Sequence, residues 1–443
     1  MSDIQNILSK IPLFKNLGLG VIFYIVLSVF IYISFYFFGF FKIFPDGTNI
    51  TSFDAYWYQN IKNNGYQYAW FQPSNSAFFP LFPYTWKILY FNSLAICCLN
   101  FLFFISGIGL LKHYFQFSTS KLLLYLSFPT CIFFFLPYSE AFFFLFSSIF
   151  LVGLKKNNQK IIFIGILLAS LTRATAMFFI PSIIMMEIIN SPNVLNKNMF
   201  KNLFLYSFAS LLGLLIVVLF QYWQTGEWFA FAKQQMRFWG HVLTIPEFPV
   251  ISHAAGEKTL WIDGFALFSG ATSCFVILIV LIKKIFFRAS GFYFSNRPFW
   301  FSAFYLCMIT LYSLFFNIKS MDAQTNIDSI ARYMFSTAFF PVFFIYCLQY
   351  FHLSLKHFSA FLLIIIVTLL SIGFLGKPLH FMITSGNESY SFVFFGMLFT
   401  YISLHYFSSH IKYGNKIGLM LFSINLVLSA ICLNNFISAV WFQ

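Results

Sequence analysis

Charge is scarce in this chain. Only 9% of its 443 residues are Asp, Glu, Lys or Arg, whereas charged residues make up about a quarter of a soluble globular domain. Hydrophobic residues instead account for 60% of the chain and aromatic residues for 23%. This composition excludes a soluble globular protein and predicts an all-α polytopic integral membrane protein.

The chain also lacks a disulfide framework. Its seven cysteines are odd in number, and all fall inside apolar runs, with no CxxC pair of the kind that binds a metal. The net charge of +14 would suggest a nucleic-acid partner in a soluble domain, but here the basic residues lie in short links between apolar runs. This pattern indicates membrane topology and no nucleic-acid partner.

Long apolar runs dominate the sequence. They lie at approximately 17–41, 92–111, 121–136, 140–154, 161–172, 174–189, 203–224, 262–282, 298–316, 333–351, 358–375, 390–408 and 417–437. Several are shorter than the ~20 residues that a full crossing needs, and we expect about 11–13 transmembrane helices. The first run follows Lys10 and Lys15 and has no small-residue cleavage site after it, so it predicts an anchor and not a signal peptide.

The stretch 161–189 admits two interpretations. As a single helix it would put the basic link 197–201 outside, although Lys155 and its basic neighbours just before the stretch require an inside start. Two short helices folded as a hairpin, with Arg173 at the bend, satisfy both links. We therefore predict the hairpin.

Basic and acidic residues separate on this topology, which places the N-terminus in the cytoplasm. The inside collects Lys10, Lys15, Lys112, Lys121, Lys155, Lys156, Lys160, Lys197, Lys201, Lys283, Lys284, Arg288, Arg297, Lys356, Lys412 and Lys416. The outside or the membrane holds Asp46, Asp54, Glu140, Glu227, Glu247, Glu257, Asp263, Asp322, Asp328 and Glu388, which leaves only Asp3 and Glu187 within. Because acidic residues contribute little to membrane insertion, insertion rules do not explain their asymmetry.

The extracytoplasmic loops are also the long ones, at about 42–91, 225–261 and 317–332. No internal repeat is visible, whereas transporters are commonly built from repeats with binding sites at the membrane midplane. Long loops on one face therefore favour an enzyme that works at the outer surface.

The first loop begins with an expected amphipathic helix that lies on the bilayer. Apolar residues recur at every fourth position: Phe53, Trp57 and Ile61. Ser52 or Thr51 can cap the helix, and Gly65 is suited to end it. Asp54 lies in its first turn, where it either complements the helix dipole or acts in catalysis.

Two prolines follow, Pro80 and Pro83. Their spacing of three makes a regular helix unfavourable. We expect the chain to re-enter the membrane here and to form a wall beside Asp54.

Short motifs occur in a fixed order between residues 50 and 240. They are Phe53-Asp54-Ala55-Tyr56-Trp57-Tyr58, Gly65-Tyr66, Phe78-Phe79-Pro80-Leu81-Phe82-Pro83, Phe128-Pro129-Thr130, Pro137-Tyr138-Ser139-Glu140-Ala141-Phe142, Thr172-Arg173 and Thr225-Gly226-Glu227-Trp228-Phe229-Ala230-Phe231, with Ala331-Arg332-Tyr333 later. In this order they resemble the motifs of the PIG-V family, the GPI mannosyltransferase 2 type, and of its bacterial relatives. Two positions depart from the family pattern: Phe53 stands where tryptophan is usual, and Glu227 where bacterial members often have aspartate.

The resemblance implies a GT-C glycosyltransferase, with a catalytic core at 1–260 and C-terminal helices at 261–443 that complete the cavity. Such an enzyme transfers a hexose, mannose by default, from a polyprenyl-phosphate donor to a hydroxyl of a glycolipid or cell-envelope glycan, with inversion and without a cofactor. The absence of a Gly-rich phosphate loop argues against a nucleotide-sugar donor. High Phe, Lys and Asn content suggests a bacterium, hence its inner membrane. The alternative is a lipid-linked saccharide flippase.

The charged residues suit this chemistry. Asp54 fits the base that activates an acceptor hydroxyl, and Arg173 fits the cation that stabilises the departing phosphate. The alternative for Arg173 is a structural ion pair with Glu140. Arg332 is either a second phosphate ligand or a surface residue that snorkels to the interface. Glu140 is either a ligand of a substrate hydroxyl or a hairpin cap.

The remaining predicted substrate-binding residues are aromatic or basic. Tyr138 and Trp57 belong to the motifs above. In the loop 225–261, Lys233, Gln234, Arg237 and His241 share a helical face that either meets a lipid phosphate or anchors to headgroups. His253 and Glu257 form an i, i+4 pair, which is poor support for a metal site because it holds a single histidine.

Overall fold

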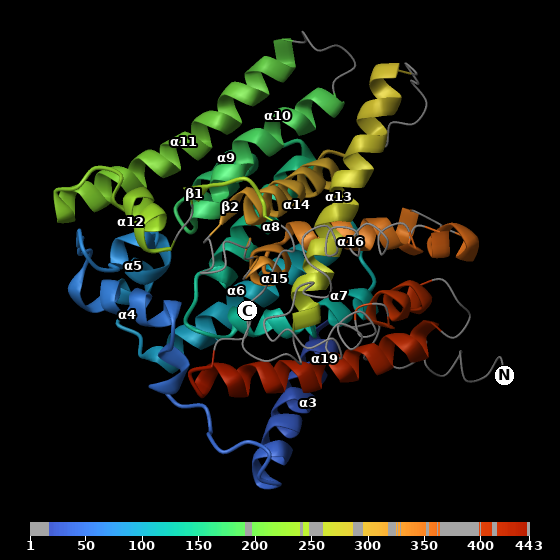
Figure 1. The fold of residues 1–443 in the computed structure, drawn as a ribbon, viewed down its shortest axis with the longest axis horizontal. Coiled ribbons are helices and arrows are strands. Elements are labelled where there is room, and N and C mark those ends of the chain that lie inside the picture. Colours follow the sequence, from blue (N-terminus) through green and yellow to red (C-terminus); the bar gives the residue numbers. More distant parts are fainter. Residues whose placement is uncertain are drawn as a thin grey trace.

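The computed structural model describes residues 17–190, 197–239, 242–247, 260–286, 296–317, 325, 327, 329–350, 354–360, 362–363, 398, 400–409 and 414–440. Within these ranges the chain is almost entirely helical (Figure 1). Most of the predicted runs 358–375 and 390–408 lie outside the described residues. So do Asp3, Glu257, Asp322, Asp328, Glu388, Lys10, Lys15, Arg288, Lys412, His241 and His253.

Six of the described helices are long and apolar enough to cross a membrane. They are α3 (Leu17–Phe37), α6 (Ser93–Phe115), α11 (Lys197–Thr225), α13 (Leu260–Phe286), α14 (Arg297–Phe315) and α19 (Gly414–Ile437). Apart from its two ends, an α-helix satisfies its backbone hydrogen bonds within itself, which a lipid environment requires. The prediction of an all-α protein with membrane-spanning segments is confirmed at this level.

Shorter helices fill the space between them. They are α7 (Thr119–Leu126), η3 (Pro129–Phe134), α8 (Glu140–Lys156), α9 (Gln159–Ser170), η4 (Ala174–Phe178), α10 (Phe179–Asn190), α15 (Ile330–Phe335) and α16 (Phe339–Tyr350). The run 333–351 was predicted as one apolar segment, but its start belongs to α15 and the rest forms α16. The short helix α15 carries Arg332.

The centre of the fold is α8, which packs against α6, α9, α14 and η3. Its approach to α9 depends on Gly165, since a Cβ there would lie 2.6 Å from the backbone nitrogen of Phe150. Small residues allow helices in membranes to approach this closely. The contact fixes α8, and hence Glu140 at its first position.

The predicted hairpin at 161–189 is confirmed. Helices α9 and α10 are separated at Arg173, and both pack on α11. Arg297 joins the two open ends: its Nη1 donates to Oδ1 of Asn157 at 3.0 Å, and its Nη2 pairs with Glu187. Asn157 precedes α9 and Glu187 lies near the end of α10. Because both contact Arg297, α10 runs back towards the start of α9, as in a hairpin.

The first loop folds into η1 (Asn49–Thr51), α4 (Asp54–Asn64), η2 (Asn75–Ala77) and α5 (Leu81–Ile88). Gly65 ends α4 as predicted, with φ +77° and its N–H bonded to the carbonyl of Ile61. The predicted side-chain cap is wrong, because the N-cap is Phe53 with φ +55° and no side-chain hydrogen bond. The packed face also differs: Ala55, Tyr58 and Ile61 are buried, whereas Trp57 is only partly covered.

The expectation that Pro80 and Pro83 prevent a regular helix is wrong. Pro80 is the N-cap of α5, and Pro83 lies in its first turn. The first N–H groups of a helix have no partner within it, so proline costs little at these positions. The prolines therefore start a short helix instead of interrupting one.

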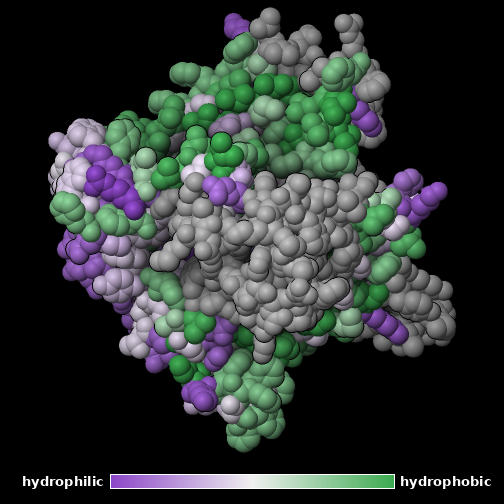
Figure 2. All heavy atoms as spheres, viewed as in Figure 1, coloured by the Kyte–Doolittle hydropathy of each residue, from purple (hydrophilic) through white to green (hydrophobic). Residues whose placement is uncertain are grey.

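Two small elements complete the fold: α12 (Ala230–Phe238) and an antiparallel pair of two-residue strands, β1 (Val242–Leu243) with β2 (Phe316–Asn317). Helix α12 packs on η2 and lies beside α4 and α5 at the left of Figure 1. Hydrophilic side chains gather over this end in Figure 2, whereas apolar side chains cover most of α11 and the upper part of α13. The strand pair ties the two later long loops together.

Contacts between helices identify the two ends of the bundle. Phe53 at the start of α4 packs on Phe436 near the end of α19, with ring centroids 5.6 Å apart, so Gly414 and Lys416 lie at the opposite end. Lys156, at the end of α8, contacts Tyr114 near the end of α6 through a 2.9 Å hydrogen bond. We call these two ends the Asp54 end and the basic end.

Candidate functional site

The site begins at the sharp backbone turn before α4. Phe53 has φ +55° and ψ −125°, a conformation that costs a non-glycine residue roughly 1–3 kcal/mol. Its ring packs on Phe436. The turn fixes Asp54 at the first position of α4, and strain of this kind is characteristic of functional sites.

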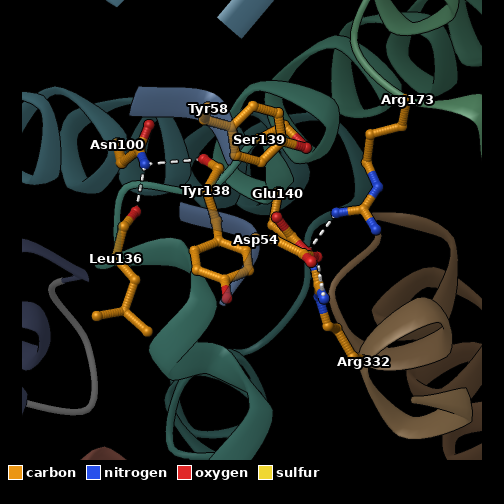
Figure 3. A network of polar contacts seen from close by, with 9 residues as sticks. All are labelled: Asp54, Tyr58, Asn100, Leu136, Tyr138, Ser139, Glu140, Arg173 and Arg332. Atoms are coloured by element: carbon orange, nitrogen blue, oxygen red, sulfur yellow. Dashed lines mark hydrogen bonds and ion pairs between the residues drawn. The ribbon is translucent and has the colours of Figure 1, made fainter. Parts of the chain in front are cut away.

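Hydrogen bonds in the preceding turn fix the position of Glu140, the first residue of α8. Asn100 of α6 donates through Nδ2 to the carbonyls of Leu136 at 2.5 Å and Tyr138 at 2.9 Å (Figure 3). The hydroxyls of Tyr58 and Ser139 lie 2.7 Å apart. Burial raises the pKa of Tyr58 well above its ordinary value, more than the charge of Arg173 lowers it, so this hydrogen bond joins two neutral hydroxyls.

Four charged side chains alternate in sign at this point (Figure 3). Arg332 donates from Nη1 to Oδ2 of Asp54 at 2.7 Å and from Nε to Oε1 of Glu140 at 2.5 Å. Arg173 pairs with the same oxygen of Glu140. The four charges sum to zero, so the cluster offsets the cost of burying each charge by pairing it.

The four side chains differ in their exposure to solvent. The side chain of Glu140 is 0% exposed and that of Arg332 4%, whereas Arg173 is 12% and Asp54 24% exposed. Both arginines use Oε1 of Glu140, and Oε2 is buried without a hydrogen bond among the described residues. Glu140 therefore holds the two arginines, and Asp54 is the more accessible carboxylate.

Aromatic rings surround the guanidinium groups. The guanidinium carbon of Arg332 lies 4.7 Å from the ring centre of Tyr138 and 4.9 Å from that of Phe133. Arg173 lies 5.9 Å from the ring of Tyr333. Such contacts favour a cation where water is excluded.

The cluster lines a cavity of about 740 Å³, within the ~300–1,000 Å³ range of ligand pockets. Asp54, Arg173 and Arg332 supply its charge. Its other walls are mostly apolar and aromatic and include Phe78, Phe79, Phe178, Phe231, Trp239, Tyr312 and Tyr333. Phe78 and Phe79 form the wall that was predicted beside Asp54.

Several predicted site residues thus meet here. Asp54, Arg173 and Arg332 line the cavity, with Glu140 and Tyr138 in contact with Arg332. Arg173 does form the ion pair with Glu140 that was its alternative interpretation, and it also borders the cavity. The snorkelling alternative for Arg332 is wrong, because this residue is buried and paired with two carboxylates.

Trp57, Lys233 and Arg237 lie further out. Trp57 packs against Phe78 and Trp239, which line the cavity. Lys233 pairs with Glu227.

Arg237 lies over the ring of Trp70 at 4.4 Å and donates to its carbonyl at 3.1 Å. Gln234 does not belong to an exposed basic face as predicted. It is buried and donates to the carbonyl of Ala69 at 2.6 Å, so this face of α12 holds the first loop.

Sequence reasoning missed three members of the site. Tyr58 lies one helical turn after Asp54, a spacing that places both on one face. Tyr333 follows Arg332 directly and lines the cavity. Asn100 is a polar residue inside an apolar run, the kind of position that is usually functional or structural in a membrane protein.

A metal centre was not expected. Among the described residues, no group of three or more His, Cys, Asp or Glu side chains could hold a metal ion. His253 and Glu257 lie outside this part of the chain.

Comparison with known proteins gives no match to a protein-family model, a curated protein or a solved structure.

Proposed function

We propose that the protein is a membrane glycosyltransferase of the GT-C type that transfers a hexose from a polyprenyl-phosphate donor to a hydroxyl acceptor. The observation that carries the proposal is the cavity in which an accessible carboxylate, Asp54, adjoins two guanidinium groups. Sugar transfer from a lipid phosphate needs both groups: a base for the hydroxyl and cations for the leaving phosphate. The aromatic walls suit the sugar face and the lipid chain of such a donor.

The proposed reaction is a single displacement. Asp54 takes the proton of the acceptor hydroxyl while the hydroxyl oxygen forms a bond to the anomeric carbon of the sugar. The bond from that carbon to the phosphate oxygen breaks on the opposite side, and its electron pair leaves with the polyprenyl phosphate. One displacement inverts the configuration at the anomeric carbon.

Each arginine has a separate part in this proposal. Arg332 holds Oδ2 of Asp54, and Oδ1 is the atom proposed to receive the proton. Arg173 uses Nη1 on Glu140, and a guanidinium group has five N–H donors. Its remaining donors are proposed to bind the phosphate. The glycoside and the polyprenyl phosphate leave the site, and Asp54 then releases its proton to the phosphate or to water.

The proposal includes an orientation in the membrane. The basic end is assigned to the cytoplasm because lysine and arginine accumulate on that side. Asp54 and its cavity then open at the extracytoplasmic face of a bacterial inner membrane. The proposal includes about 11–13 crossings, of which the described residues supply six candidate spans.

The test is transfer by the purified protein in lipid nanodiscs. Labelled polyprenyl-phosphate mannose, and then other hexoses, is supplied with a lipid extract from the source membrane as acceptor. The proposal requires a labelled glycolipid from the wild type and formation slowed about 10²–10⁴-fold in Asp54→Asn. Asp46→Asn is the matched control, because Asp46 is an exposed carboxylate of the same loop that lies outside the cavity.

The same purified protein, reconstituted into liposomes, distinguishes the flippase alternative. Protein that produces no glycoside with any donor, yet moves labelled lipid-linked saccharide across proteoliposomes, contradicts the transferase. Loss of that movement in Asp54→Asn would then assign the cavity to transport.

A further inference from the structure

A second cavity lies at the basic end, away from Asp54. It has a volume of about 410 Å³ and is bordered by α3, α7, α16, α19 and the helical residues 400–409. Figure 1 shows α7, α16 and α19 extending away from α4, α5 and α12. The proposed sugar transfer uses none of its residues.

The mouth of this cavity is polar and basic. Lys121 and Lys416 border it, together with hydroxyl groups that include Ser408 and Ser409. Two helices begin there, α7 at Thr119 and α19 at Gly414. Helix N-termini and lysines both favour an anion, so the mouth is complementary to a phosphate group.

Deeper in the cavity lies a buried polar side chain without a partner. His405 is 2% exposed, and neither ring nitrogen has a hydrogen bond among the described residues. Its ring is stacked on Phe265 with centroids 5.5 Å apart. A neutral imidazole always carries one donor and one acceptor, and leaving both unpaired in an apolar site is unfavourable. The position therefore indicates a ligand with its own polar atom at this depth.

The spacing of these groups matches an amphiphile. His405 and Ser408 lie three residues apart on one helix, which separates them by about 4.5 Å along the axis. An anion at the mouth and a hydrogen-bond acceptor one helical turn deeper are the phosphate and the ester carbonyl of a glycerophospholipid. The apolar residues below, such as Phe128 and Phe344, suit an acyl chain.

We propose that the basic-end cavity is a binding site for an anionic glycerophospholipid. The phosphate binds Lys121 and Lys416, and the imidazole of His405 donates to an acyl ester carbonyl. This site is independent of the proposed transferase chemistry, and its occupant anchors α7, the helix 400–409 and α19 to one another.

The test measures lipid binding to the full chain after its native lipid has been removed by detergent exchange. Thermal unfolding is followed while phosphatidylglycerol or phosphatidylcholine with identical acyl chains is added. We expect phosphatidylglycerol to raise the unfolding temperature at lower concentration, and each of Lys121→Gln and Lys416→Gln to weaken its apparent affinity about fivefold. Lys201→Gln is the control, because Lys201 is an exposed lysine of α11 that does not border the cavity.

A further variant examines the depth of the site. His405→Phe keeps the ring but removes its hydrogen bond, and we expect weaker binding of phosphatidylglycerol with the lysines intact. If Lys121→Gln does not fold, Lys416→Gln alone tests the contribution of positive charge, because Lys416 is exposed.

Three results would overturn the lipid site. The first is equal binding of the two lipids, and the second is an equal loss in Lys201→Gln. The third is the same stabilisation by inorganic phosphate without any lipid, which would indicate a free anion as the ligand.

Discussion

At the scale of single residues, the site depends on Glu140 more than its position in the sequence suggests. Its one engaged oxygen holds both Arg173 and Arg332, and Arg332 in turn holds Asp54. Spacing along the chain does not reveal this arrangement, because Asp54, Glu140 and Arg332 lie far apart in sequence. The motifs indicated each residue separately, but only the fold brings them together.

Removing the charge of Glu140 is expected to destabilise the protein. In Glu140→Gln two buried arginines lose their shared carboxylate, and breaking a buried ion pair costs about 3–5 kcal/mol. Thermal unfolding in detergent measures the loss. Glu227→Gln provides the comparison, since Glu227 pairs with Lys233 at a partly exposed position where a pair contributes about 0–1 kcal/mol. Equal stability of the two variants would contradict the central role of Glu140.

A lysine substitution at Arg173 distinguishes the contribution of its positive charge from that of its donor geometry. Arg173→Lys keeps a positive charge for Glu140 but loses the planar fork of donors. We expect the variant to fold, with a higher KM for the lipid-phosphate donor than the wild type. A steady-state titration of donor measures the change, and an unchanged KM would remove Arg173 from the phosphate site.

At the scale of elements, the sequence predicted most helices and failed where tertiary contacts decide. Long apolar runs predicted α3, α11, α13, α14 and α19, and the positions of the basic links predicted the bend at Arg173. The helix α5 was missed because prolines are unfavourable in a helix interior but acceptable in its first turn. Helix α15 crosses the boundary between the predicted loop 317–332 and the apolar run 333–351, so the sequence did not indicate the burial of Arg332.

The close contact between α8 and α9 gives a prediction at this scale. A Cβ at Gly165 would lie within 3 Å of the backbone of Phe150, so Gly165→Ala is expected to lower stability by roughly 1–3 kcal/mol. Gly109→Ala on α6 is the control, since a Cβ at that glycine meets no atom within 4 Å. Thermal unfolding of both variants checks the difference, and equal unfolding temperatures would show that α8 and α9 can separate without cost.

At the scale of the whole molecule, the bundle has an Asp54 end and a basic end. The lysine links predicted a basic end from sequence, and in the structure Lys156 and Tyr114 bring the ends of α8 and α6 together there. The assignment of each end to a side of the membrane remains a prediction. So does the division of the chain at residue 260, although Arg332 from the second segment meets Asp54 and Glu140 from the first.

Labelling of single cysteines tests the orientation. In a variant without the seven native cysteines, Asp46→Cys is expected to react with a membrane-impermeant maleimide in intact cells. Lys156→Cys is expected to react only after the cells are made permeable. The reverse pattern would place the cavity on the cytoplasmic side and would exclude the proposed donor orientation.

The most direct test of the central claim is the rate of hexose transfer by Asp54→Asn in nanodiscs. Loss of a general base lowers a rate about 10²–10⁴-fold, and we predict a fall of this size with an unfolding temperature close to that of the wild type and of Asp46→Asn. A folded Asp54→Asn variant that transfers hexose at the wild-type rate would contradict the account.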